Sequence, residues 1–168
     1  VGKGLIEFGT GAGKTIMTAA ICKRVCPLGK MIIIVPSTDL VKNTADQLIY
    51  LGFDCGSVYK DGSKTTAYSK NAVVVTWQSI LSMNRRAKGK GYWQDKIKEA
   101  EIECNKLLAK RKTVELKALQ AQISVMEQNL KDDMIKAKDE LDTLKKDVIG
   151  FIFDEAHQGK GSEIKTIL

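Results

Sequence analysis

The stretch Phe8-Gly9-Thr10-Gly11-Ala12-Gly13-Lys14-Thr15 decides the fold of this chain. Its alternating glycines let the backbone approach an anion closely, with several N–H groups pointing inward. An apolar segment at Leu5–Glu7 precedes it, and apolar residues at helical spacing follow it along Lys14–Val25. These apolar residues are Ile16, Met17, Ala20, Ile21 and Val25. A strand, a glycine-rich turn and a helix in this order predict a phosphate-binding loop with the helix N-terminus facing the phosphates.

The residues of this loop have distinct expected roles. Lys14 is expected to reach the β- and γ-phosphates, and the Thr15 hydroxyl to hold Mg²⁺. The remaining nucleotide contacts are expected from four residues: Thr10, Gly11, Ala12 and Gly13. The strict loop pattern has glycine where this chain has Phe8, so a glycine-rich turn without a ligand is the alternative. The strand before the turn and the helix after it favour nucleotide binding.

Continuous apolar runs alternate with helical segments further along the chain. Three runs are predicted strands buried on both faces: Met31–Val35, Ala72–Thr76 and Val148–Phe153. Pro36 ends the first run, and Ser37 or Thr38 can cap a helix that continues to about Leu51. Another helix is predicted to start at Trp77–Ser82. Strands alternating with helices predict an α/β fold with a parallel sheet and right-handed crossovers.

An acidic pair follows the last of these strands, in the sequence Asp154-Glu155-Ala156-His157. Asp154, at the carboxyl end of the strand, is expected to bind Mg²⁺ directly or through water. Glu155 is expected to position and deprotonate the attacking water. His157 is the only histidine in the chain. A lone histidine is usually structural, but this position after an acidic pair favours a catalytic role.

The phosphate loop and the Asp154–His157 segment together resemble motifs I and II of superfamily 2 DEAD/DEAH-box helicases. In that family the first position of motif I is often not glycine, which accommodates Phe8. Val35–Val41, Thr76–Ser79 and Asp154–Gly161 resemble the corresponding segments of phage UvsW-like DNA helicases and of the related restriction-type and XPB-type translocases. The resemblance implies a RecA-like P-loop NTPase lobe that uses ATP and Mg²⁺. It also implies an enzyme that couples ATP hydrolysis to movement on, or remodelling of, DNA in replication, recombination or repair.

Two further segments support the resemblance. Ile33–Val41 resembles motif Ia, and Val74–Ser79 resembles a later motif at a strand end. The resemblance implies nucleic-acid contacts at six residues: Pro36, Ser37, Thr38, Thr76, Trp77 and Gln78. Both segments offer hydroxyl groups and helix N-termini to the phosphates of a nucleic-acid backbone. Backbone contacts carry no sequence information, which suits movement along a strand. Simple helix capping is the alternative interpretation of the same hydroxyl groups.

Residues 85–147 differ in composition, being rich in charged residues and lacking proline. Apolar residues alternate in steps of three and four with one irregular step, as in a coiled-coil seam: Leu116, Leu119, Ile123, Met126, Leu130, Met134, Ala137, Leu141, Leu144 and Val148. A single 50-residue helix would carry the chain roughly 75 Å away from the sheet. We therefore expect an antiparallel helical hairpin, with its turn near Lys110–Thr113 and Thr113 as a cap. The hairpin would be inserted into a lobe formed by residues 1–84 and 148–168.

Three interpretations of the hairpin at residues 85–147 remain open. It can be a solvated insertion that packs against itself, a DNA-contacting arm, or a docking arm for a protein partner. The second interpretation uses basic residues at its base and tip: Arg85, Arg86, Lys88, Lys90 and Lys110-Arg111-Lys112. Tyr92 and Trp93 can stack on bases or anchor the hairpin to the core.

The chain has 168 residues and a formal net charge of +7, which fits a polyanionic partner. DNA, duplex or branched and contacted through its backbone, is the expected partner, and RNA is expected less. The cysteines are Cys22, Cys26, Cys55 and Cys104, without a C-x-x-C pair. This spacing favours buried or incidental thiols in a reducing cytoplasm over a zinc site. The resemblance implies the cytoplasm of a bacterium or of a phage-infected host. No apolar run approaches the roughly 20 residues of a membrane span.

We expect the chain to be part of a longer protein, whose second RecA-like lobe supplies arginines to the transferred phosphoryl group. Alone, it is expected to be nearly inactive. The chief alternative is an SMC/Rad50-like ATPase, which also places a coiled coil between its phosphate loop and its acidic strand end. An RNA helicase and a non-hydrolysing nucleic-acid-binding module are further alternatives. The segments at residues 36–38 and 76–79 favour a helicase.

Overall fold

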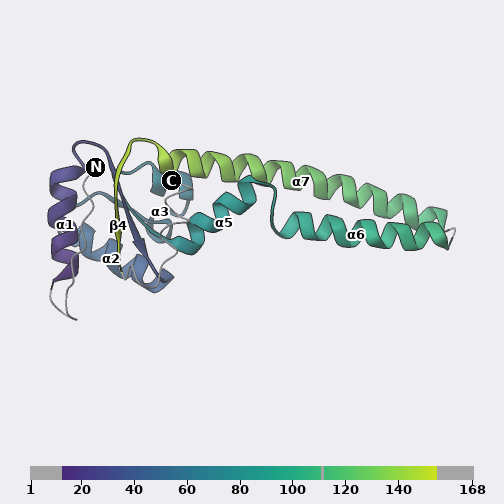
Figure 1. Cartoon of the computed structure of the whole chain (residues 1–168), viewed down its shortest axis with the longest axis horizontal. Helices are drawn as coiled ribbons and strands as arrows, with labels where there is room; N and C mark the ends of the chain where they lie inside the picture. Colours follow the sequence, from purple (N-terminus) through teal and green to yellow (C-terminus); the bar gives the residue numbers. More distant parts are fainter. Residues whose placement is uncertain (1–12, 111, 155–168) are drawn as a thin grey trace. The chain divides into compact units, whose positions relative to one another are not determined.

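The computed structural model describes residues 13–110 and 112–154. In chain order its elements are α1 (Lys14–Val25), β1 (Lys30–Val35), α2 (Thr38–Tyr50), β2 (Cys55–Gly56), α3 (Val58–Asp61), α4 (Lys64–Tyr68), β3 (Ala72–Thr76), α5 (Trp77–Ala87), α6 (Tyr92–Ala109), α7 (Thr113–Lys145) and β4 (Val148–Phe153) (Figure 1). They form two compact units. The first is built on Val1–Gln78 and Thr143–Thr166, and the second on Ser79–Asp142.

The first unit contains a four-stranded parallel sheet in the order β2-β3-β1-β4. This sheet, with helices between its strands, confirms the predicted α/β fold. The central strands β1 and β3 are buried along their whole length, as their apolar runs predict. Strand β4 lies at the edge of the described sheet and is only partly buried, with Ile149 41% exposed. The prediction that β4 is buried on both faces is therefore wrong, because β1 is the only described element that packs extensively against β4.

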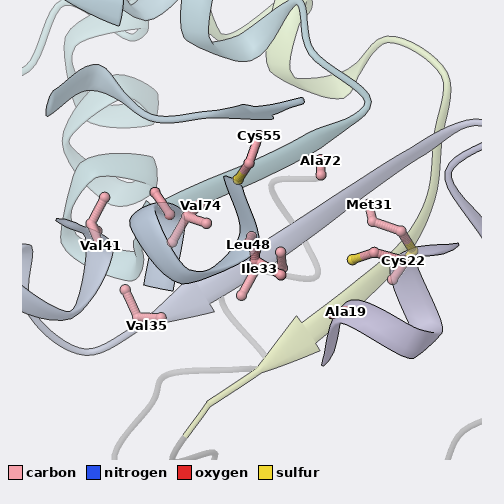
Figure 2. Packing of buried hydrophobic residues seen from close by; sticks show 11 residues of the cluster. Ala19, Cys22, Met31, Ile33, Val35, Val41, Leu48, Cys55, Ala72 and Val74 are labelled. Atoms are coloured by element: carbon pink, nitrogen blue, oxygen red, sulfur yellow. The ribbon is translucent and has the colours of Figure 1, made fainter. Parts of the chain in front are cut away.

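The core of the first unit lies between β1, β3 and the helices α1 and α2. Its buried members are Ala19, Cys22, Met31, Ile33, Val35, Val41, Ala45, Leu48, Cys55, Ala72 and Val74 (Figure 2). Helix α1 contributes small side chains to it. Ile16 and Met17, which the apolar spacing placed on the predicted face, are 67% and 40% exposed. The predicted helix is therefore correct, whereas its most buried face carries Ala19 and Cys22.

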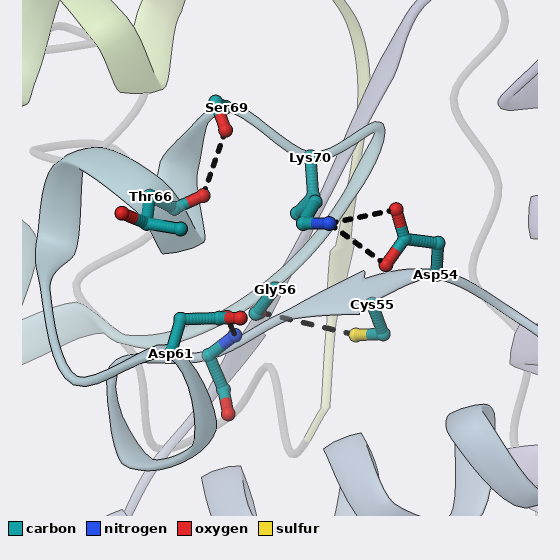
Figure 3. Close-up of polar contacts among 8 residues, drawn as sticks. Asp54, Cys55, Gly56, Asp61, Thr66, Ser69 and Lys70 are labelled. Carbon is teal, nitrogen blue, oxygen red and sulfur yellow. Dashed lines mark hydrogen bonds and ion pairs between the residues drawn. The ribbon is translucent and has the colours of Figure 1, made fainter.

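The edge strand β2 and the short helices α3 and α4 were not predicted. A two-residue strand gives no periodic signal. Polar contacts stabilise this region (Figure 3): the Lys70 ammonium donates to both Asp54 oxygens at 2.9 and 3.0 Å, and the Ser57 amide donates to the Asp61 carboxylate at 2.9 Å. A Cβ at Gly56 would lie 1.9 Å from the Ala67 carbonyl oxygen. Only glycine therefore allows α4 to approach β2 this closely.

The second unit consists of most of α5, all of α6 and most of α7. Figure 1 shows α6 running antiparallel to the first part of α7, as the predicted hairpin requires. Helix α6 ends at Ala109 and α7 begins at Thr113, so the turn lies where it was predicted. The amide of Leu116 donates to the Lys112 carbonyl at 3.1 Å. The cap position is therefore Lys112, one residue before the predicted Thr113.

The predicted seam coincides with the shielded side of α7. Every seam position from Leu116 to Leu144 is partly or fully buried. Positions between them, such as Val114 and Val125, are 81% and 61% exposed. Helix α5, whose start at Trp77 was predicted, is continuous to Ala87. No helix within residues 13–110 and 112–154 combines the length and the apolar composition needed to cross a bilayer.

Candidate functional site

The carboxyl ends of three strands are aligned at one edge of the sheet. Strand β1 pairs with β3 up to Val35 opposite Thr76, and with β4 up to Ile34 opposite Phe153. The amide of Asp154 donates to the Ile34 carbonyl at 2.9 Å, which continues the β4 pairing by one residue. The first residues after these strands, Pro36, Trp77 and Asp154, therefore lie at the same edge of the sheet. Each belongs to a segment for which the sequence predicts a functional role.

The N-terminal end of α1 lies at this same edge. Helix α1 runs antiparallel to β1 and β4 (Figure 1). Its 12 residues rise about 18 Å, and the six residues of β1 span about 20 Å. The C-terminal end of α1 adjoins the start of β1, since the Cys26 thiol and the Met31 amide both donate to the Asn71 carbonyl, at 3.5 and 2.7 Å. Equal lengths and opposite directions bring Lys14 level with the ends of the strands.

Gly13 is the described end of the predicted phosphate loop. Gly13 has φ 84° and ψ 29°, a left-handed conformation that glycine adopts without strain. Its carbonyl accepts the first hydrogen bond of α1, from the Met17 amide at 3.1 Å. Lys14 is exposed, and Thr15 and Asp154 are partly exposed. These three side chains, from α1 and from the end of β4, are therefore open to solvent at one edge.

These residues fit a nucleotide with its Mg²⁺ better than a cage of protein ligands. The described part of the chain contains no group of three histidine, cysteine or acidic residues that could hold a metal ion. Mg²⁺ needs no such group when it binds with a nucleotide, because phosphate oxygens, water and one or two protein ligands complete its shell. Thr15 and Asp154 are the described residues that would supply protein oxygens.

The two segments predicted to contact nucleic acid are joined directly. The side-chain amide of Gln78 donates to the Pro36 carbonyl at 3.2 Å. The Ser37 hydroxyl accepts from the Leu40 amide at 3.3 Å and caps α2. Ser37 and Thr38 are exposed, Trp77 is partly exposed, and Thr76 is only 4% exposed. Of the predicted hydroxyl contacts, those of Ser37 and Thr38 are therefore the accessible ones.

Sequence reasoning named Gln78 and Pro36 but missed the bond between them. It also missed Tyr59, whose ring lies 4.8 Å from the Lys42 ammonium on α2. No local pattern links these two residues, because they belong to different helices. Thr10, Gly11, Ala12, Glu155 and His157 lie outside the described residues. Their predicted roles stay predictions.

The thiols nearest the site are suppressed as nucleophiles. Burial, together with the neighbouring Cys26, raises the pKa of Cys22, on α1, to about 12. Burial also raises the pKa of Cys26. All four cysteines are free thiols, and Cys22, Cys55 and Cys104 are buried. The predicted assignment as buried thiols is confirmed for these three.

The sequence model of one family, described as type III restriction enzyme, res subunit, matches residues 2–168. No curated protein and no solved structure matches the chain. The family indicates an ATP-binding domain of helicase type, and it implies ATP, usually with Mg²⁺, and a nucleic-acid partner. The parallel sheet with aligned strand ends is the architecture expected of such a lobe. The chain therefore belongs to the family of the type III restriction enzyme res subunit, as an ATP-binding helicase-type domain of superfamily 2.

Proposed function

We propose that this chain is the first ATP-binding lobe of an ATP-dependent DNA helicase or translocase. One observation carries the proposal: Lys14, Ser37, Gln78 and Asp154 all lie at the carboxyl edge of one parallel sheet. Ligands of open α/β folds bind at this edge, where the connections after the strands diverge. A nucleotide site and a nucleic-acid site on adjacent strand ends are what an ATP-driven motor needs.

On the nucleotide side, the expected contacts follow from residue chemistry. Lys14 would neutralise charge on the β- and γ-phosphates, while Thr15 and Asp154 would orient a bound Mg²⁺. The ion would offset charge that develops on the transferred phosphoryl group. Glu155 would accept a proton from the attacking water, and His157 would complete the motif. Lys14 is exposed and Asp154 is partly exposed, so both side chains are accessible to a bound nucleotide, which supports these roles.

On the nucleic-acid side, the bonding pattern offers a route for coupling. The Asp154 amide is bonded to the Ile34 carbonyl, two residues before Pro36. Pro36 in turn accepts a hydrogen bond from Gln78. A displacement of Asp154 that accompanies hydrolysis would reach the turn at Ser37 through these two contacts. The phosphate backbone is the proposed ligand of Ser37 and Thr38, because both hydroxyls are exposed at a helix N-terminus.

Paired variants in the full-length protein test the nucleotide site. Lys14→Ala is expected to abolish ATP binding, and Glu155→Gln to retain binding but stop turnover. Lys23→Ala is the matched control, since Lys23 is an exposed lysine in the last turn of the same helix. Binding is measured with a fluorescent ATP analogue and turnover by phosphate release. Full turnover in Glu155→Gln would exclude Glu155 as the base.

The substrate is tested by stimulation of the ATPase. We expect duplex or branched DNA to raise turnover more than RNA does, and stronger stimulation by RNA would assign an RNA helicase instead. We further propose that a second RecA-like lobe completes the cleft and supplies arginines to the transition state, a contribution of roughly 10³-fold or more. The isolated chain should then hydrolyse ATP negligibly. DNA-stimulated turnover by this chain alone would contradict that expectation.

A further inference from the structure

The junction between α5 and α6 folds back on itself and clusters its basic residues. The Lys90 amide donates to the Arg85 carbonyl at 2.8 Å, and the Gly89 amide donates to the Arg86 carbonyl at 2.9 Å. This pair of bonds is the Schellman motif that ends helices, and it requires a left-handed residue at Gly89, which has φ 69°. The motif returns the chain over the last turn of α5. Arg85 and Lys90, five residues apart in sequence, are thereby brought together.

Two contacts fix this junction against α7. The Arg86 guanidinium donates to Asp133, with its Nε 3.1 and 3.0 Å from the two carboxylate oxygens. Its Nη1 lies 3.6 Å from a Glu140 oxygen. A Cβ at Gly89 would lie 3.1 Å from the Met134 sulfur, so the backbone here packs tightly on α7. The Arg86 side chain is therefore already engaged by α7, and its contacts fix the junction at one position on that helix.

The other basic residues of the junction face solvent. Arg85, Lys88 and Lys90 are exposed, in contrast to Arg86, whose side chain is 25% exposed. Tyr92 follows two residues after Lys90 and is 66% exposed. Trp93 is partly buried and its ring makes a T-shaped contact with the Tyr92 ring, with the ring centroids 5.1 Å apart. Of the two aromatic residues, Tyr92 is therefore the one available for stacking, and Trp93 is the one suited to anchoring.

We infer that the α5–α6 junction is a binding site for single-stranded nucleic acid. Arg85, Lys88 and Lys90 contact the phosphates, and a base stacks on Tyr92. Three exposed cations fixed beside an exposed ring match a strand whose backbone is anionic and whose bases are unstacked. The Lys96 ammonium lies 6.0 Å from the centre of the Tyr92 ring. An acidic protein segment would use the cations but would make no use of the exposed part of the Tyr92 ring.

This inference rests on the proposed function, because both require nucleic acid as the partner. The test compares the triple variant R85Q/K88Q/K90Q with the control K117Q/K131Q/K136Q in the full-length protein. The control removes the same charge from exposed lysines of α7. Affinity for a fluorescent oligothymidylate is measured by anisotropy over a range of salt concentrations. The logarithm of the association constant falls linearly with the logarithm of the salt concentration, and each lost phosphate contact makes this slope less steep by about 0.7. The slope of the triple variant should therefore be less steep by about 2.

Tyr92 gives an independent readout. Stacking on an aromatic side chain contributes about 1–3 kcal/mol per base, so Tyr92→Ala should weaken binding of the single strand roughly 5- to 150-fold. Tyr92→Phe should retain the affinity. Binding of a blunt duplex should be unaffected by either change, since its bases are not available for stacking. Equal losses for duplex and single strand in Tyr92→Ala would overturn the stacking contact.

Several outcomes separate this site from the proposed function. An unchanged salt slope in the triple variant, with wild-type stimulation of the ATPase by DNA, would overturn the inference and leave the proposed function standing. That result is also expected if the hairpin docks a protein. A wild-type protein that neither binds nor responds to any nucleic acid would overturn both. An unchanged urea midpoint of the triple variant, followed by circular dichroism, would confirm that the substitutions leave the hairpin folded.

Discussion

The ion-pair cluster at Arg86 gives a prediction whose magnitude follows from its burial. We consider Arg86→Met, which keeps most of the side-chain volume and removes the charge. In the folded protein the guanidinium engages both oxygens of Asp133 and approaches Glu140 at 3.6 Å. These hydrogen bonds raise the pKa of Arg86, with Asp133 as the main cause. The substitution leaves two carboxylates close together with their shared cation removed.

The expected loss lies between the values for exposed and buried pairs. Exposed pairs contribute about 0.2–1 kcal/mol, whereas breaking a buried pair costs about 3–5 kcal/mol. The Arg86 and Asp133 side chains are 25% and 27% exposed, and Glu140 is 5% exposed. Because Glu140 is almost fully desolvated, we expect Arg86→Met to lower the free energy of unfolding by about 2–4 kcal/mol. Arg86→Lys, which keeps the charge but loses the fork geometry, should lose about 1 kcal/mol.

Urea unfolding followed by circular dichroism measures these values. The control is Lys112→Gln, whose pair with Glu115 is about half exposed on both sides and should lose at most about 0.5 kcal/mol. Adding Glu140→Gln to Arg86→Met should recover about 1–2 kcal/mol, because the buried negative charge is then removed. If Arg86→Met loses no more than the control, the cluster behaves as a surface pair and the reasoning is refuted.

Three further predictions concern single buried or strained positions. Burial raises the pKa of both Cys22 and Cys55 to about 12, so neither thiol should react with iodoacetamide at about pH 8 until urea unfolds the protein; rapid labelling of native Cys22, detected by mass spectrometry, would contradict this. Burial lowers the pKa of Lys30 below 10.5, so the unfolded chain holds this proton to higher pH than the folded protein does. The free energy of unfolding should therefore rise as the pH increases from the folded pKa toward 10.5, and this rise should be absent in Lys30→Met. Identical dependence of stability on pH in the two proteins would argue against this prediction. Gly89→Ala should lower the melting temperature more than Gly62→Ala. Both positions have positive φ, which costs alanine about 1–2 kcal/mol, but only at position 89 would the added Cβ lie 3.1 Å from the Met134 sulfur.

The sequence specified the regular elements well because their signals are local. The central strands lack any polar alternation, and the Ser37 cap follows directly from the residue that precedes α2. The face of α1 could not be predicted in the same way. Its large apolar residues Ile16 and Met17 are exposed in the first turns, while the small residue Ala19 is buried. Apolar spacing alone favours the large side chains, whereas close packing of a helix on a sheet selects the small ones.

The candidate site was predicted as separate segments and not as an arrangement. Residue chemistry selected Lys14, Ser37, Gln78 and Asp154 independently of one another. Their common edge depends on strand order, which places β1 between β3 and β4. Strand order is set by non-local pairing and leaves no periodic trace in the sequence. The bond from Gln78 to Pro36 depends on the same pairing, because it joins the ends of two adjacent strands.

The irregular step in the α7 seam acquires a physical reason from the helices that face it. Steps of three and four alternate from Leu116 to Leu130, where α7 runs beside α6, and a second step of four then leads to Met134. Met134 is the residue that packs against Gly89, where α5 gives way to α6. A single helix that passes from one partner to another must shift its apolar stripe, and an inserted step achieves this shift. The irregular step in α7 therefore marks the position at which the facing limb of the hairpin changes from α6 to α5. It also indicates that the basic junction between these two helices has a fixed position on α7.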